Sequence, residues 1–287
     1  MNTWKGITNK YYSFSISEKI IIINVLCFFI PFILNTFFFL FNFQIGNLSS
    51  WIELSPRISV IMFRPWTLLT YSFFHSGISH LFWNMLILYY SGSIFLNLFK
   101  KDTFINIYFL GVIFGGITFV ISYLIFPAFN GAFPSMIGSS AGVMAVLIFT
   151  CTYTPETEIR LIFFNLKLKY IGIFLVAIDL VMIPYGNAGG RISHLGGALL
   201  GFLYANNLSR GIDIGLSFER LWKSIIKLFL KQRLRKVYKS KKNKSNTTNS
   251  SQINQEEIDN ILDKISKSGY DSLTKLEKET LFKAGDK

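Results

Sequence analysis

Six long apolar segments, separated by short polar or charged loops, run through the chain as far as Leu208. They cover Ile20–Phe43, Leu81–Phe99, Phe104–Phe126, Met136–Tyr153, Leu168–Pro184 and Gly189–Leu208. Because an α-helix rises about 1.5 Å per residue, about 20 residues cross the roughly 30 Å hydrocarbon core of a membrane. The pattern therefore predicts an all-α membrane protein, in which residues 20–208 form a six-transmembrane-helix bundle whose fourth and fifth spans are short.

The loop between the first two spans, residues 42–79, is long and rich in Trp, Pro and aliphatic residues. We expect it to lie in the membrane interface rather than in water. The overall composition agrees with a membrane location, because 51% of the residues are hydrophobic and only 16% are charged, against about 25% charged in soluble domains. The two cysteines, Cys27 and Cys151, lie in apolar runs and are interpreted as small apolar side chains rather than a disulfide or zinc site.

Positive charge alternates between the loops. The N-terminus and the loops after the second and fourth spans are basic, whereas the intervening loops carry only Arg57, Arg64 and Arg191. The positive-inside rule then predicts that both termini are cytoplasmic, with residues 1–19 as a cytosolic N-terminus, in a membrane that we expect to be the bacterial inner membrane. Of the 29 Lys and Arg residues, 18 lie from Arg210 onward, so the net charge of +13 belongs to the tail and does not indicate nucleic-acid binding.

The tail divides into two parts. Residues 209–254 form a basic amphipathic juxtamembrane segment and flexible linker, with 11 Lys or Arg and no acidic residue between Arg220 and Lys244. We expect this segment to bind anionic lipid, less tightly as salt rises, although a solvated linker is the alternative. Residues 255–287 predict a small module of two soluble helices, which Gly269 separates and in which Thr274 and Glu277 form a capping box.

Few polar residues interrupt the apolar segments. They are His80 and Asn84, spaced to share one helix face, then Ser140, Asp179 and His194. Polar groups inside a membrane are costly and are therefore candidates for function. Counted from the predicted cytoplasmic ends of their spans, Asn84, Ser140 and His194 all lie about 21–22 Å into the membrane, so they are predicted to stand at one level.

These residue types suit acyl transfer. A serine hydroxyl becomes a nucleophile when an imidazole removes its proton, which makes Ser140 and His194 a candidate catalytic dyad. His80, the Asn84 amide and the backbone N–H of Ser140 are candidates to stabilise the oxyanion. No carboxylate is clearly placed to orient His194. Asp179 is either a triad acid or part of an ordered network near the extracellular mouth.

The dyad requires the fourth and sixth spans to approach closely. Gly138 and Gly142 on the fourth and Gly197 and Gly201 on the sixth each offer small residues four apart, which predicts that these two helices meet through their glycines. Two neighbours of the dyad have other expected roles. Ser139 is expected to cap or pack, and His75 to make a structural hydrogen bond or to lie in the interface.

The combined pattern resembles the rhomboid intramembrane serine proteases. It consists of His80-xxx-Asn84, Gly138-Ser139-Ser140 and His194-xx-Gly197-xxx-Gly201 across six spans. The resemblance implies that Ser140 is the nucleophile and His194 the general base, with His80 and Asn84 at the oxyanion. It also implies cleavage of transmembrane-helix substrates near the outer membrane face, without metal or cofactor, with lateral entry beside the fifth span under a cap formed by residues 184–190.

The sequence departs from the family pattern at two positions and matches a third in part. Ala141 follows the nucleophile where Gly is common, and Met144 stands where many members have an aromatic residue that packs on the histidine. Arg64-Pro65-Trp66 resembles the first-loop Trp motif of the family, without the Arg that often follows the Trp.

Other functions are weighed against a protease. A catalytically inactive rhomboid-like protein that binds and escorts membrane-protein clients is the main alternative. A transporter would need paired charges across the midplane, and Asp179 alone hardly meets that requirement. Gly138-x-Ser140-x-Gly142 also matches the nucleophile elbow of soluble α/β-hydrolases, but the elbow follows a buried strand, and residues 129–137 are a loop containing Gly and Pro.

Overall fold

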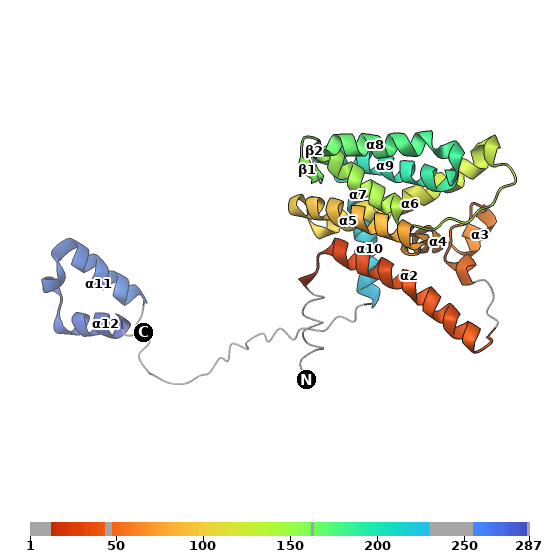
Figure 1. Ribbon diagram of the computed structural model, residues 1–287. Coiled ribbons are helices and arrows are strands. Elements are labelled where there is room, and N and C mark those ends of the chain that lie inside the picture. The colour runs from red at the N-terminus through yellow and green to blue at the C-terminus, as the bar shows by residue number, and fades with distance from the viewer. Residues whose placement is uncertain (1–12, 44–47, 162–163, 230–254, 286–287) are drawn as a thin grey trace. The chain divides into compact units, whose positions relative to one another are not determined.

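The computed structural model describes residues 13–43, 48–161, 164–229 and 255–285. The chain divides into two compact units, Met1–Gln232 and Arg233–Lys287. The main helices of the first unit, shown in Figure 1, are α2 (Ile16–Leu40), α5 (Ile78–Leu98), α6 (Lys101–Ile125), α7 (Ser140–Tyr153), α8 (Leu168–Val181), α9 (Ala188–Ser209) and α10 (Leu216–Phe229). Each of the six apolar segments of the sequence coincides with one of the helices from α2 to α9.

Shorter elements connect these helices. The loop between α2 and α5 folds into the 3-10 turns and short helices η1 (Leu48–Trp51), α3 (Ile58–Phe63), α4 (Thr67–Thr70) and η2 (Tyr71–Phe73). Further along the chain are η3 (Pro127–Phe129), the antiparallel hairpin of β1 (Glu158–Leu161) and β2 (Phe164–Lys167), and η4 (Ile183–Tyr185). The long first loop is therefore structured rather than extended.

Three helices, α2, α5 and α6, are long and apolar enough to cross a membrane by length and composition. Helix α7 is apolar but only 14 residues long, and α9 has 22 residues but carries Arg191 and His194. Helix α9 is not a candidate span because polar side chains lower its hydropathy. Helix α7 is not one because it begins at Ser140 and is too short. Within the described residues, the membrane character of the protein is supported, but a count of six crossings is not confirmed.

Helix α7 forms the centre of the bundle. Every residue from Ala141 to Cys151 is buried, because α5, α6, α8 and α9 all pack against this helix (Figure 1). The aromatic side chains of Phe95, Phe104 and Phe149 are fully buried among these helices. A helix that is apolar on all sides is the kind that a larger fold encloses.

The contact between α7 and α9 is a backbone contact made possible by glycine. A Cβ atom at Gly197 would lie 2.1 Å from the carbonyl oxygen of Ala141, and one at Gly201 would lie 2.2 Å from that of Ala145. The predicted role of the α9 glycines is thus confirmed, but the predicted role of the α7 glycines is wrong. Gly142 instead faces α6, where a Cβ would lie 2.9 Å from the Tyr108 carbonyl oxygen, and Gly138 precedes the helix.

Replacing Gly201 by Ala is therefore expected to destabilise the bundle. The added methyl group would separate α7 from α9, which costs about 1–3 kcal/mol or more and outweighs the gain of about 1 kcal/mol in helix propensity. The thermal unfolding midpoint of the detergent-solubilised protein measures this effect. Gly77→Ala is the matched control, because a Cβ at Gly77 has no atom within 4 Å; a Gly201→Ala midpoint equal to that of the control would contradict the prediction.

Helix α10 begins the basic tail and packs on α6. Trp222 donates its indole N–H to Asn106 Oδ1 at 3.2 Å, and Lys223 pairs with Asp102 at 2.6 Å. On the other side of α10, Leu221 and Leu228 are exposed. An amphipathic helix with an exposed apolar face fits the expected contact with lipid, which stays a prediction; residues 230–254 lie outside the described residues.

The second unit is a pair of helices, α11 (Gln255–Ser268) and α12 (Lys275–Gly285), joined through η5 (Tyr270–Ser272). The capping box is present, since Thr274 N donates to Glu277 Oε2 at 2.7 Å and Glu277 N donates to Thr274 Oγ1 at 3.4 Å. Lys264 of α11 pairs with Glu277 at 2.9 Å. This ion pair joins the two helices, and the side chain of Ile261 on α11 is buried.

Candidate active site

Ser140 is the first residue of α7, and the loop before it has a shape that requires glycine. Gly138 has a φ of +135°, and a Cβ there would lie 2.7 Å from His80 Cε1, 2.8 Å from His80 Nε2 and 3.6 Å from Ser140 Oγ. The backbone of Gly138 thus lies directly against the imidazole of His80. His80 Nε2 and the Ser140 hydroxyl both point towards the space beside this glycine.

The first loop fixes the segment that leads to Ser140. Leu54 and Met136 exchange backbone hydrogen bonds of 3.0 and 2.9 Å, and Gly138 N donates to the Tyr71 carbonyl oxygen at 3.0 Å. Tyr71 is itself held, because its hydroxyl donates to the Val112 carbonyl oxygen at 2.7 Å. The first loop therefore positions the candidate nucleophile, a role that the sequence did not reveal.

His75 adds a side-chain contact to this support. Its Nε2 lies 3.1 Å from Ser139 Oγ, and the ring is buried. Of the two roles expected for His75, the structural hydrogen bond is confirmed. Ser139 occupies the N-cap position of α7, but its side chain makes no cap hydrogen bond and contacts His75 instead.

A carboxylate orients His194. Asp179, buried on α8, places Oδ2 at 3.0 Å from His194 Nδ1, and its Oδ1 accepts a hydrogen bond of 3.1 Å from Arg191 Nη1. With Nδ1 engaged in this way, Nε2 is the nitrogen left to face a nucleophile. The sequence left open whether a carboxylate orients His194. The structure places Asp179 in that position, within an ordered network that includes Arg191, so the candidate dyad is extended to a candidate triad.

His194 is supported by an ion pair rather than by an aromatic side chain. Met144 is buried and lines the site without supplying an aromatic face. The ion pair between Asp179 and Arg191 instead restrains the imidazole through Nδ1. The charge pattern of the sequence places Arg191 among the loop residues. In the structure Arg191 lies inside α9 and neutralises Asp179. Its charge therefore does not indicate on which side of the membrane the neighbouring loop lies. Two opposite charges in neighbouring apolar segments were the signal that could have revealed this pair.

Ser140, His80 and His194 line two cavities at once. The first, of about 610 Å³, extends to the loop before α9 and is bordered by Ser76, Asn187 and backbone of glycines. The second, of about 590 Å³, lies among α5, α7, α8 and α9. Its walls include Trp83, Ile87, Val143, Leu175 and Ile178, which make it mainly apolar. The candidate site thus stands where a mixed cavity, with both polar and apolar walls, meets a mainly apolar one.

The candidate oxyanion donors also lie at this junction. His80 Nδ1 is 3.1 Å from Ser76 Oγ, so a serine donating to Nδ1 leaves a proton on Nε2. Asn84 lines the apolar cavity, and its Nδ2 donates to the His80 carbonyl oxygen at 2.9 Å. Since an amide nitrogen carries two hydrogens, one remains for the cavity. Within the described residues, no hydrogen bond joins Ser140 to His194.

Comparison with known proteins gives two family matches. The model described as the Rhomboid domain matches residues 63–211. A second, described as a family of unknown function (DUF6576), matches residues 243–283. The first match contains every residue of the candidate site, and the second overlaps the helical pair at the C-terminal end of the chain.

Curated relatives share 29% identity with the chain. They include RHOMBOID-like protein 12, mitochondrial, of Arabidopsis thaliana, aligned over 52% of this chain and 48% of that protein. Presenilin-associated rhomboid-like protein A, mitochondrial, of Danio rerio aligns over 53% of this chain and 37% of its own length. For the presenilin-associated rhomboid-like protein, mitochondrial, of Homo sapiens, the shares are 59% and 42%.

The chain spans about half the length of these relatives or less. Their names place them in mitochondria and give no support to the expected bacterial membrane. Because the Rhomboid domain match covers more than half of the chain, this membrane protein belongs to the rhomboid family.

Proposed function

We propose that the chain is an intramembrane serine endopeptidase. The observation that carries the proposal is that Ser140 and His194 line the same two cavities while Asp179 holds the far side of the imidazole. Ser140 Oγ attacks the scissile carbonyl carbon as His194 Nε2 accepts the hydroxyl proton. The tetrahedral intermediate then expels the amine, which takes this proton from His194.

Hydrolysis of the acyl-enzyme completes the reaction. His194 removes a proton from water, the resulting hydroxide attacks the ester carbonyl, and Ser140 leaves with the proton restored. Asp179 stabilises the imidazolium that forms in each half-reaction. His80 Nε2–H, the free amide hydrogen of Asn84 and the backbone N–H of Ser140 stabilise the oxyanion.

The proposed substrate is a single-span transmembrane segment. The apolar cavity between α5 and α8 suits an apolar peptide, whereas the cavity towards Asn187 suits water. A transmembrane helix has its carbonyl groups bonded within the helix, so the segment must unwind before Ser140 can attack one of them. Cleavage therefore favours helix-destabilising sites near the membrane face on which the mixed cavity opens.

We further propose that α2, α5, α6, α7, α8 and α9 all cross the bilayer, with both termini on the side of the basic loops. The distribution of Lys and Arg supports this topology. Single cysteines placed at Lys101 and at Ser55 of a Cys27→Ala, Cys151→Ala chain test it. A membrane-impermeant maleimide should label them from opposite sides of intact vesicles, and labelling from one side would contradict the proposal.

Labelling with a fluorophosphonate tests the proposed chemistry, because only an activated serine reacts. The purified full-length protein should be labelled at Ser140, and Ser140→Ala should lose the label. Ser91→Ala is the matched control, since this buried serine donates to the Ile87 carbonyl oxygen within α5 and lies outside both cavities. Wild-type protein that remains folded and unlabelled would overturn the proposal.

The second candidate is a catalytically inactive protein that binds membrane-protein clients. It is favoured by the absence of a hydrogen bond between Ser140 and His194 among the described residues. Such bonds are often long before substrate binds, and the Asp179–His194 contact is the one that a general base requires. The fluorophosphonate experiment separates the two functions, because an inactive relative would not react.

A further inference from the structure

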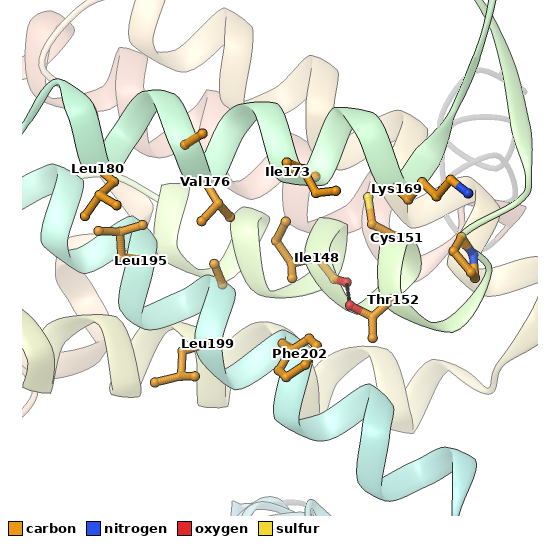
Figure 2. A pocket seen from close by; sticks show the side chains of 14 residues that line it. Ile148, Cys151, Thr152, Lys169, Ile173, Val176, Leu180, Leu195, Leu199 and Phe202 are labelled. Carbon is orange, nitrogen blue, oxygen red and sulfur yellow. Dashed lines mark hydrogen bonds between the residues drawn. The ribbon is translucent and has the colours of Figure 1, made fainter.

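A third cavity lies on another face of α8 from the candidate active site. It has a volume of about 680 Å³ and is bounded by α7, α8 and α9. Figure 2 shows Val176 and Leu180 of α8 facing Leu195 of α9, with Ile148 of α7 between the helices. Ser140, Asp179 and His194 are not among its lining residues, so the cavity is a separate feature. We call it the α8–α9 groove.

The groove has the length of one membrane leaflet. Its lining runs along α8 from Lys169 to Leu180, which is about 16 Å at the rise of an α-helix. Half of the hydrocarbon core is about 15 Å. The flanking side chains of Ile173 and Leu180 are 66% and 60% exposed, so the groove opens towards the lipid that surrounds a membrane protein. An extended acyl chain has the length and the apolar character that this space accepts.

One end of the groove is basic. Lys169 lines it at the start of α8 (Figure 2), and both Lys169 and Lys167 pair with Glu156. These lysines hold the pKa of Glu156 down to about 2, so the carboxylate stays charged at neutral pH. Arg160 and Glu158 add one charge of each sign on β1. The mouth of the groove therefore carries one net positive charge, while its remaining length is apolar.

We propose that the α8–α9 groove binds an anionic phospholipid, with one acyl chain between the helices and the phosphate beside Lys167 and Lys169. Hydrocarbon surrounds the whole bundle, so an acyl chain alone gives little selectivity. The selectivity comes from the charge at the mouth. A net charge of one near the membrane surface corresponds to about a fivefold preference for an anionic over a zwitterionic headgroup.

Photo-crosslinking of the full-length protein in vesicles tests the proposal. The probes are phosphatidylglycerol and phosphatidylcholine that carry the same diazirine on one acyl chain. Mass spectrometry of the digested protein then gives the crosslink yield on residues 169–180 and 195–202. We expect the yield with phosphatidylglycerol to be about fivefold higher. Equal yields from the two lipids in the wild-type protein would overturn the proposal.

Two pairs of variants make the test specific. Lys167→Gln together with Lys169→Gln should abolish the preference, whereas Lys101→Gln, at the exposed start of α6, should keep it. Ala177→Phe should fill the groove and lower both yields, whereas Ile121→Phe, on a 45% exposed position of α6, should not. Undiminished crosslinking in folded Ala177→Phe, or a preference retained by the double lysine variant, would overturn the proposal. The yield depends on no catalytic activity, so its failure leaves the proposed protease function untouched.

Discussion

Replacing Ser140 by Ala is expected to lower the turnover of a reconstituted transmembrane substrate by about five to six orders of magnitude, the usual cost of removing a catalytic serine. The hydroxyl is the atom that bonds to the substrate in the proposed mechanism, and no other group of the site can replace it. His194→Ala should cost about as much, because an unactivated hydroxyl is a poor nucleophile. The double variant should lose little more than either single one, since the two groups act as one unit. A fluorogenic substrate in vesicles of the purified protein measures these rates.

The control for this series is Ser91→Ala, which removes a buried serine from α5 and should retain wild-type turnover. Two outcomes would contradict the mechanism. One is cleavage that survives in either single variant. The other is a double variant whose loss equals the product of the two single losses, because independent effects would mean that Ser140 and His194 do not exchange a proton.

The positions of the helices could be predicted from the sequence because one requirement determines them, which is that backbone groups inside a membrane must be hydrogen-bonded. Apolar runs of about 20 residues must be helical in a membrane, since every backbone group needs a partner within its own segment. Helix α5 begins at Ile78 rather than at Leu81, and α2 begins at Ile16 rather than at Ile20. Both differences arise at polar positions. The Ser15–Glu18 capping box starts α2 before its apolar run begins.

The sequence predicts one level for Asn84, Ser140 and His194, because depth along a helix follows from counting residues, and the three residues line one cavity. The rotation of a helix about its axis cannot be predicted in this way. Asp179 reaches His194 because α8 turns that face towards α9, and the packing of both helices against α7 determines this rotation. The same limit explains the error at Gly142. Its spacing from Gly138 suits a helix contact, but the neighbour on that face is α6.

The helices that carry Ser140 and His194 are not among the three candidate spans. Helix α9 holds His194 and Arg191, and Arg191 pairs with Asp179 of α8; the two polar residues lower the hydropathy of α9. Helix α7 begins at Ser140 and has only 14 residues. Length and composition therefore select α2, α5 and α6, although the apolar pattern of the sequence also indicates the helices that bear the candidate nucleophile and base.

Replacing Asp179 by Asn is expected to lower kcat by between about 10² and 10⁴, with little change in KM. The amide preserves the shape of the side chain but can donate to Nδ1, which favours the wrong tautomer of His194, and it cannot stabilise the imidazolium. Both carboxylate oxygens of Asp179 are engaged, one by His194 and one by Arg191, so Asp179 acts as a positioning residue through His194. Fluorophosphonate labelling of Ser140 should slow in parallel, because that reaction uses the same base.

Asp102→Asn is the matched control, because it removes a carboxylate that pairs with Lys223 outside the site and should leave kcat unchanged.

Arg191→Gln should have a smaller effect than Asp179→Asn, because the guanidinium acts only by holding the carboxylate at 3.1 Å. A merely structural Asp179 would give a different pattern, in which thermal stability falls but folded protein keeps its kcat. The contradicting outcome is an Asp179→Asn protein of unchanged melting point whose kcat is within about twofold of the wild type. It would show that His194 needs no carboxylate and that the site works as a Ser–His dyad.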